Sequence, residues 1–317
     1  MNETLDNLKK AAEIHKKIRK ECIQYIKQDR KYSDIVKIYE DCIKKDSDDK
    51  SGIAFPIGFS ANNICAHDSA YINDNRKINK NDILKIDIGV HYDGYIIDSA
   101  QTIIVDNNVD NMDETTQNLL NSTRDATLTV IKNAGVDVRL YELSEIIYEI
   151  INSYDNIKPI TILGGHNIKR FQIHGGKLIL GKPHLLQMDM KMEENEIYAI
   201  ETFASTGTGD LMNLGNITHY KQNKFDKQSQ KYMKNFFIKD YIYNRNNMPF
   251  NSKWIYDVNK NQENKIKKEI NDLVRCNILE AYPPLSDINR NSKTSQFEHT
   301  IYIKNNGVEN LSIDDDY

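Results

Sequence analysis

The chain has 317 residues, of which 39% are hydrophobic, enough to bury a sizeable core. Its 42 basic and 46 acidic residues give a net charge of -4, which does not favour binding to nucleic acid. The apolar runs are far shorter than the roughly 20 residues that span a bilayer, and the first residues lack the apolar stretch of a secretory signal. Four scattered cysteines predict free thiols. We therefore expect a globular, cytoplasmic protein with no membrane segment.

The first half of the chain passes from helices to strands and back to helices. Apolar residues recur at helical spacing across residues 5–45, which predicts two amphipathic helices. Strand-like segments dominate residues 51–105. Helical patterns return at about 114–134 and 140–154.

The second half contains a segment of different composition. Strands and loops resume near residue 161, and a final strand is expected at 296–303. Between them, residues 218–279 are rich in Lys, Asn and aromatic residues and end in a helical pattern. We predict that this segment is an inserted helical subdomain and that residues 1–217 and 280–317 together form the main domain.

Two aspartates lie on the arms of a predicted hairpin. Asp93-Gly94 stands between two apolar runs, and this dipeptide favours a two-residue hairpin turn. Counting from that turn, Asp98 faces Gly89 across the hairpin, and Asp87 lies two positions further along on the same face. Such diagonal neighbours have Cβ atoms roughly 7–8 Å apart or less. Both carboxylates can therefore reach a common metal site.

The alternative is that each aspartate begins or ends a strand at the surface. Asp is depleted in strands, however, and both of these are embedded among isoleucines. Two half-buried carboxylates side by side repel each other unless a cation neutralises them. The hairpin by itself leaves both interpretations open.

Four further polar residues stand in unusual surroundings. His166 and His174 each lie beside glycines, which let the backbone approach a ligand closely, and Glu201 and Glu298 each interrupt an apolar strand. Taken singly, such histidines are more often loop residues and such glutamates more often face solvent. As a set, two Asp, one His and two Glu suit paired divalent ions of the Mn, Fe or Co kind better than a structural zinc.

These residues carry a family resemblance. In order, Asp87, Asp98, His166, Glu201 and Glu298 resemble the five metal ligands of the pita-bread metallopeptidases. Over nearly the whole chain the flanking sequence resembles the type 2 methionine aminopeptidases, which carry a helical insert between the two glutamates. The most specific matching segments are Phe55-Pro56, Asn62-Asn63, His67 and residues 85–89, 96–98, 199–203, 282–285 and 296–300.

The resemblance implies a role for each metal ligand. Asp87 would hold one of two divalent ions (Co, Mn, Fe or Zn), His166 and Glu201 would hold the other, and Asp98 and Glu298 would bridge them. A dinuclear site of this kind uses a metal-bridged water or hydroxide as nucleophile. Glu201 would also move a proton from that nucleophile to the leaving nitrogen.

The resemblance also implies substrate contacts. His67 would face the scissile bond and His174 would contact the substrate backbone, so that both count with Glu201 as catalytic. Neither histidine is expected to bind metal. The methionine pocket would be lined by Phe55, Ile173, His219 and Tyr282, although His219 also fits an ordinary loop position.

The fold and activity that follow are specific. The resemblance implies an α/β (α+β) domain of the pita-bread, or creatinase/aminopeptidase, type with a curved antiparallel sheet and a winged-helix-like insert. The activity implied is hydrolytic removal of the initiator methionine from nascent proteins, with a preference for a small second residue. The partners implied are the N-terminal Met of nascent polypeptides and transient proximity to the ribosome, with no nucleic acid or membrane. We expect a monomer.

One departure and three alternatives qualify this interpretation. Lys169 and Arg170 stand where the family commonly has a glycine and an uncharged residue, which questions substrate access near the site. A non-enzymatic pita-bread protein would lose metal ligands, whereas all five are present here. An X-Pro aminopeptidase or dipeptidase would carry a separate domain before His67. A purely structural protein would leave the buried carboxylates unexplained.

Overall fold

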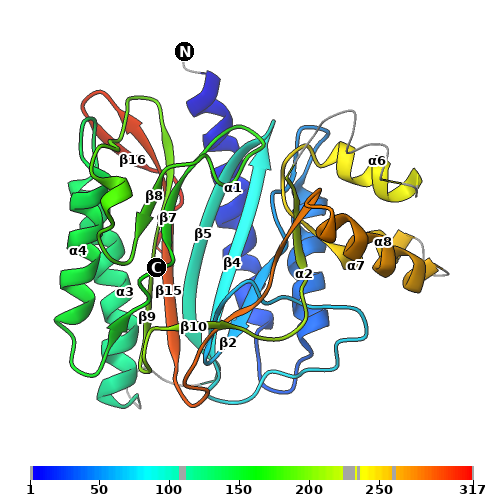
Figure 1. The fold of residues 1–317 in the computed structure, drawn as a ribbon, viewed down its shortest axis with the longest axis horizontal. Coiled ribbons are helices and arrows are strands. Elements are labelled where there is room, and N and C mark those ends of the chain that lie inside the picture. The colour runs from blue at the N-terminus through cyan, green and yellow to red at the C-terminus, as the bar shows by residue number, and fades with distance from the viewer. Residues whose placement is uncertain (1–2, 107–111, 224–232, 234–235, 259–261, 316–317) are drawn as a thin grey trace.

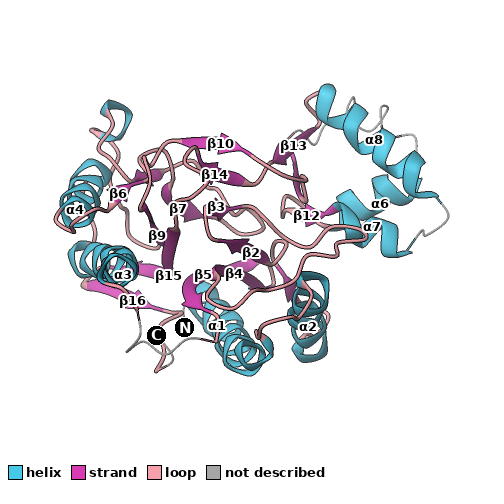
Figure 2. Ribbon diagram, turned by 90° about the horizontal axis from the view of Figure 1, so that it is seen from below, coloured by secondary structure: helices cyan, strands magenta, loops and turns pink. Residues whose placement is uncertain are grey.

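A computed structural model describes residues 3–106, 112–223, 233, 236–258 and 262–315. Strands fill the centre of the molecule, and the first four α-helices pack along its outer side (Figure 1). Figure 2 shows a further group of helices, α6, α7 and α8, at one end of the strands. Among the described residues, no helix combines the length and apolar character needed to cross a membrane.

The predicted helices of the first half are confirmed, because each places an apolar stripe against the strands. α1, for example, buries Leu8, Ala11 and Ile18. α3 begins where Asp113 accepts a hydrogen bond from the Thr116 backbone N–H. The helices are α1 (Glu3–Cys22), η1 (Ile23–Tyr25), α2 (Tyr32–Asp46), α3 (Glu114–Asn133), α4 (Leu140–Asn152), η3 (Leu185–Gln187), α6 (Phe236–Asn244), α7 (Ser252–Val258) and α8 (Glu263–Arg275).

Two antiparallel sheets make the centre. The first has the order β1-β4-β2, with β5 also paired to β4, and consists of β1 (Ser51–Ile53), β2 (Gly58–Ala61), β4 (Ile83–Tyr92) and β5 (Tyr95–Ile104). The second has the order β16-β15-β9-β7-β8, with β6 paired to β9. Its strands are β6 (Lys158–Pro159), β7 (Gly164–Ile168), β8 (Leu178–Leu180), β9 (Ile197–Ser205), β15 (Thr294–Lys304) and β16 (Gly307–Asn310).

Two smaller sheets of three strands complete the fold. One has the order β10-β14-β3 and the other β12-β11-β13. Their strands are β3 (Ile64–Ala66), β10 (Leu211–Asn213), β14 (Leu285–Asp287), β11 (His219–Gln222), β12 (Phe250–Asn251) and β13 (Leu279–Tyr282).

Hydroxyl groups join the two central sheets where β5 lies beside β15. The Thr300 hydroxyl accepts from the Asp98 N–H at 2.8 Å and donates to the Asp98 carbonyl at 2.6 Å. Further along, the Ser99 hydroxyl donates to the Glu298 carbonyl at 2.8 Å, and the Thr102 hydroxyl donates to the Gln296 carbonyl at 2.7 Å. These side-chain hydrogen bonds take the place of backbone pairing between β5 and β15. They fix the position of one sheet relative to the other.

The predicted hairpin turn at Asp93-Gly94 is confirmed. Both residues have positive φ, 51° and 78°, as a type I′ turn requires. The register then pairs Gly89 with Asp98, as counting from the turn predicted. A side chain at Gly94 would also collide with the ring of Phe171, whose nearest atom lies 2.5 Å from the position of a Cβ.

The segment 218–279 has its own group of buried apolar side chains. Phe250, Ile255, Ile266 and Ile270 belong to it, and α7 and α8 pack against the strands β12 and β13 of the small sheet. Residues 224–232, 234–235 and 259–261 of the predicted insert lie outside the described residues. The division into domains stays a prediction.

The same segment is anchored to the first sheet by a half-buried arginine. The Arg245 guanidinium donates to the carbonyls of Ile53 and Ala54, each at 2.8 Å. Trp254 donates to the Glu40 carboxylate on α2 at 2.6 Å. Because Ile53 and Ala54 immediately precede Phe55, the insert helps to hold the residues that shape the pocket described next.

Candidate metal centre and pocket

Five strands each contribute one of the predicted metal ligands. Asp87 lies on β4, Asp98 on β5, His166 on β7, Glu201 on β9 and Glu298 on β15. The ladder of the second sheet pairs Glu298 directly with Glu201 and pairs His166 with Ala199, two residues before Glu201. Because side chains two positions apart share a face, these three side chains project together toward the first sheet.

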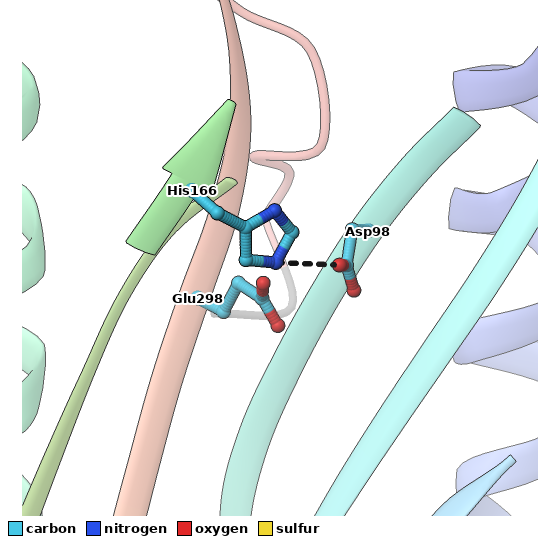
Figure 3. A group of neighbouring side chains, drawn as sticks. All are labelled: Asp98, His166 and Glu298. Carbon is cyan, nitrogen blue, oxygen red and sulfur yellow. Dashed lines mark ion pairs between the residues drawn. The ribbon is translucent and has the colours of Figure 1, made fainter. Parts of the chain in front are cut away.

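The ligand atoms converge between the sheets. His166 Nε2 lies 3.7 Å from Asp98 Oδ2 and 3.7 Å from Glu201 Oε1. Figure 3 shows the imidazole directed at Asp98, with the Glu298 carboxylate beside both. Donor atoms of Asp98, His166 and Glu298 all lie within 4.8 Å of one another, a spacing suited to a shared cation. Asp87 is connected to this cluster by Gln296. The Gln296 amide donates to Asp87 Oδ2 at 3.1 Å and to Glu201 Oε2 at 3.2 Å.

This concentration of acids is electrostatically costly without a cation. Burial raises the pKa of Asp87 to about 6 despite its hydrogen bond from Gln296. Burial and then the neighbouring carboxylates raise the pKa of Asp98 and Glu298 well above their ordinary values, and burial and Asp87 do the same for Glu201. Among the described residues, none of these acids forms an ion pair with a lysine or arginine.

Several carboxylate oxygens of the cluster have no hydrogen-bond donor. Asp87 Oδ1, Asp98 Oδ1 and both oxygens of Glu298 are buried and receive no hydrogen bond from any described residue. Buried polar atoms are otherwise nearly always paired. An oxygen-rich donor set with one imidazole and unused carboxylate oxygens fits divalent cations of the Mn, Fe or Co kind.

Sequence reasoning gave Gln296 no role, although the structure places it at the centre of the cluster. It lies two residues before Glu298 on β15 and therefore on the same face. That spacing was a usable signal. Lys85 lies two residues before Asp87 and donates to the Asn62 carbonyl at 2.8 Å. It also lines the pocket described next.

A pocket of about 460 Å³ opens above the carboxylates. Phe55 is held close to the hairpin, since a Cβ at Gly89 would lie 2.1 Å from its ring. Glycine is therefore required opposite Asp98. All six predicted substrate-contacting residues line this pocket, namely Phe55, His67, Ile173, His174, His219 and Tyr282.

The pocket histidines are uncharged at neutral pH. Burial lowers the pKa of His67 to about 4, and burial followed by the charge of His166 lowers that of His174 to about 2. The two imidazoles flank Tyr282, with ring centroids at 5.5 Å from His67 and 6.0 Å from His174. His174 also meets the His166 ring edge-on at 4.6 Å. This wall offers neutral hydrogen-bonding groups beside the cluster.

The remaining predicted positions are also located. His219 is a buried strand residue rather than a loop residue, and its ring nitrogens lie 2.9 Å from the Thr218 hydroxyl and 3.2 Å from the Pro56 carbonyl. Arg170 turns toward the hairpin, where it meets the Asp93 carboxylate at 2.6 Å and the Asp93 carbonyl at 2.8 Å. Neither Lys169 nor Arg170 lines the pocket.

Comparison with known proteins decides the family. The profile of "Metallopeptidase family M24" matches residues 6–305. The chain belongs to metallopeptidase family M24. Among curated M24 relatives, methionine aminopeptidase 2 of Komagataella phaffii is 35% identical over 100% of this chain and 71% of that protein. Methionine aminopeptidase 2 of Kluyveromyces lactis is 38% identical over 98% of this chain and 76% of that protein.

Solved structures agree on the M24 fold. A thermophilic Arx1 superposes with a TM-score of 0.82 at 17% identity, covering 98% of this chain and 91% of that one. A methionine aminopeptidase from Thermotoga maritima gives a TM-score of 0.66 at 18% identity, covering 99% and 98%. At these identities the likeness concerns the fold alone. The predicted α/β pita-bread fold is confirmed.

Proposed function

We propose that this M24 chain is a type 2 methionyl aminopeptidase that hydrolyses the N-terminal methionine from nascent polypeptides. The observation that carries the proposal is the convergence of one imidazole and four buried or half-buried carboxylates beside a largely apolar pocket. The names of the curated relatives support the same activity. The segment 218–279 between Glu201 and Glu298 supports type 2.

The five ligands fit two divalent cations. Asp87, Asp98, His166, Glu201 and Glu298 would hold them through four carboxylates and one imidazole. Such ions would lower the pKa of a water molecule and stabilise negative charge on the substrate carbonyl. The protein's own contribution is rigidity, because every ligand lies on a strand and Gln296 fixes the carboxylates of Asp87 and Glu201 relative to each other.

Glu201 is the candidate proton carrier. Its carboxylate approaches both the proposed ligand His166, at 3.7 Å, and the amide of Gln296, at 3.2 Å, so it stands where a metal-held water would be. It lines the pocket and lies beside His166. It would accept a proton from the attacking water and deliver it to the leaving nitrogen, while His67 and His174 hold the scissile peptide.

The pocket supports selection for methionine. Phe55, Ile173 and Tyr282 present apolar surface that suits a flexible thioether side chain. The substrate's first residue would enter this pocket, with its peptide bond at the carboxylates. A small second residue would be preferred, because the histidine wall stands next to the cleaved bond.

We also propose a cytoplasmic location, action as a monomer and transient proximity to the ribosome. The location and the proximity to the ribosome follow from the substrate, since an initiator methionine becomes accessible as the nascent chain emerges. A role as a non-catalytic binding protein is disfavoured, because the ligand cluster and both pocket histidines are in place.

Methionine release from synthetic peptides tests the proposal. Protein stripped by a chelator and resupplied with Mn²⁺ or Co²⁺ should cleave Met-Gly-Met but not Met-Leu-Met. Glu201→Gln should abolish cleavage, whereas Glu145→Gln, a change at an exposed position on α4, should leave it intact. Absence of cleavage by wild-type protein with bound metal would favour the binding-protein alternative.

A further inference from the structure

Exposed apolar side chains gather at and beside the mouth of the pocket. Of the eleven large apolar side chains that are strongly exposed among the described residues, five fall within residues 162–188. Exposed apolar side chains are therefore more frequent in this stretch of the chain than in the rest of the described residues. We call these five residues the apolar rim: Ile162, Leu178, Leu185, Leu186 and Met188.

Two members of the apolar rim belong to the pocket and to the surface at once. Ile162 precedes β7 and Leu178 begins β8, and both line the pocket. Ile162 is 64% exposed and Leu178 is 44% exposed. A side chain that contacts both the cavity and bulk solvent stands at the mouth. Ile162 and Leu178 therefore offer apolar surface to a molecule that extends from the pocket toward solvent.

The other three members extend the surface outward from Leu178. The Gln187 amide donates to the Leu178 carbonyl at 2.9 Å and to the Ser144 hydroxyl at 2.9 Å, which holds η3 against β8 and α4. Within η3, Leu185 is 77% exposed and Leu186 is 76% exposed. The apolar surface therefore continues beyond the mouth on a fixed support.

We propose that the apolar rim binds the third and following residues of the polypeptide substrate and favours apolar side chains there. This inference rests on the proposed function, in which the first substrate residue fills the pocket and its peptide bond lies at the carboxylates. The rest of the polypeptide must leave through the mouth. An extended chain advances about 3.3 Å per residue, so three residues beyond the second cover roughly 10 Å of surface.

The charged residues of the pocket do not compete for this role. Lys221 and Glu280 line it as well, but their side chains pair with each other at 3.3 Å. The Tyr282 hydroxyl also donates to Glu280 at 2.7 Å. The pair thus offers no unmatched charge that would select charged residues at the third substrate position.

Two peptides that differ only at the third residue test the proposal. Met-Ala-Leu-Ser-Gly and Met-Ala-Asn-Ser-Gly have third side chains of similar size, and their kcat/KM values are compared on the metal-restored enzyme. We expect the leucine peptide to be preferred about five- to tenfold, because its side chain covers apolar surface. The ratio should approach one in the double variant Ile162→Asn, Leu178→Asn.

A matched control uses Ile313, which is 42% exposed and lies outside the pocket lining. Ile313→Asn should keep both the activity and the ratio of the wild type. Thermal melting checks that the double variant folds, which is expected because both substituted side chains face solvent.

The outcomes separate the apolar rim from the proposed function. Equal kcat/KM values in the wild type, or a preference that survives in the double variant, would overturn the assignment while leaving the aminopeptidase intact. Cleavage of neither peptide would contradict the proposed function itself and remove the basis of the inference. If light scattering shows a dimer that the double variant abolishes, the apolar rim is an interface between two copies, and the proposal is wrong.

Discussion

Buried carboxylates occur in two contrasting settings in this chain. At the candidate metal centre, Asp98 and Glu298 have oxygens without hydrogen-bond donors, and their pKa values are raised. Asp287 is buried as completely, yet it accepts hydrogen bonds from the Ser205 hydroxyl at 2.7 Å and the Gly209 N–H at 2.9 Å, among others. Although burial alone would raise the pKa of Asp287, these hydrogen bonds hold it below its ordinary value. Burial therefore does not reveal a carboxylate's role, whereas the supply of donors does.

The sharpest test of this contrast is Glu298→Gln. Removal of one carboxylate from the cluster should lower kcat/KM by at least about a thousandfold, because one of the proposed metal ligands is lost. The metal-free protein should be as stable as wild type or more so, because a buried charge without donors disappears. Peptide assays and chemical denaturation measure the two effects. A marked loss of metal-free stability would show that Glu298 is a structural acid like Asp287.

Asp287→Asn should behave in the opposite way. The amide keeps the size of the side chain but replaces one acceptor oxygen with a donor that faces N–H groups. We expect the free energy of unfolding to fall by about 3 kcal/mol, measured by denaturant titration. Metal affinity per folded molecule should be unchanged, as determined by calorimetry at a temperature where the variant remains folded.

Metal removal distinguishes the two settings without mutation. Cation at about a hundred times its Kd should stabilise the protein by about 2.7 kcal/mol relative to the chelated form. Scanning calorimetry with and without chelator measures this difference. Asp287→Asn should retain the increment, and Glu298→Gln should lose most of it. Equal increments in both variants would place the cation elsewhere.

The loss of folding stability at acidic pH should depend on Asp287. Its pKa in the folded state is lower than in the unfolded chain. It therefore stabilises the fold above the unfolded value of about 3.9, and this contribution is lost as the pH falls through the lower folded value. Between about pH 5 and pH 3, wild-type protein should lose more stability than Asp287→Asn. Parallel curves of Tm against pH for the two proteins would show that Asp287 does not supply this dependence.

The smallest effect is expected for Arg170→Ala. The Arg170–Asp93 pair lies at the surface, with side chains 49% and 33% exposed, so solvent screens it. We expect a loss of about 0.5 kcal/mol in stability and an unchanged KM, since Arg170 does not line the pocket. A KM change of tenfold or more would show that this loop controls substrate access after all.

The metal centre was only partly predictable from the sequence. The facing of Gly89 and Asp98 follows by counting from the Asp93-Gly94 turn, because a hairpin fixes its register locally. The pairing of Glu201 with Glu298 could not be counted in this way, since no turn joins β9 to β15. Only the family resemblance brought them together beforehand.

The direction of the Arg170 side chain could not be predicted from the sequence either. It depends on how the loop after β7 folds back onto the hairpin, where the Phe171 N–H donates to the Gly94 carbonyl at 2.7 Å. The role of Gln296 was within reach, because the spacing of two from Glu298 placed both side chains on one face. The helices were predicted well, because their apolar periodicity is a local property.

The hydroxyl contacts that join β5 to β15 have a consequence for cation binding. The hairpin alone offers two carboxylates, which bind a cation weakly, and the second sheet supplies the other donors only when both sheets are docked. Chelation thus depends on the whole tertiary structure. β15 carries both Glu298 and the Thr300 hydroxyl that binds the Asp98 backbone, so one strand supplies a donor and holds the sheets together. We therefore expect the full set of donors, and with it the affinity for a cation, to be lost as a unit when the two sheets separate.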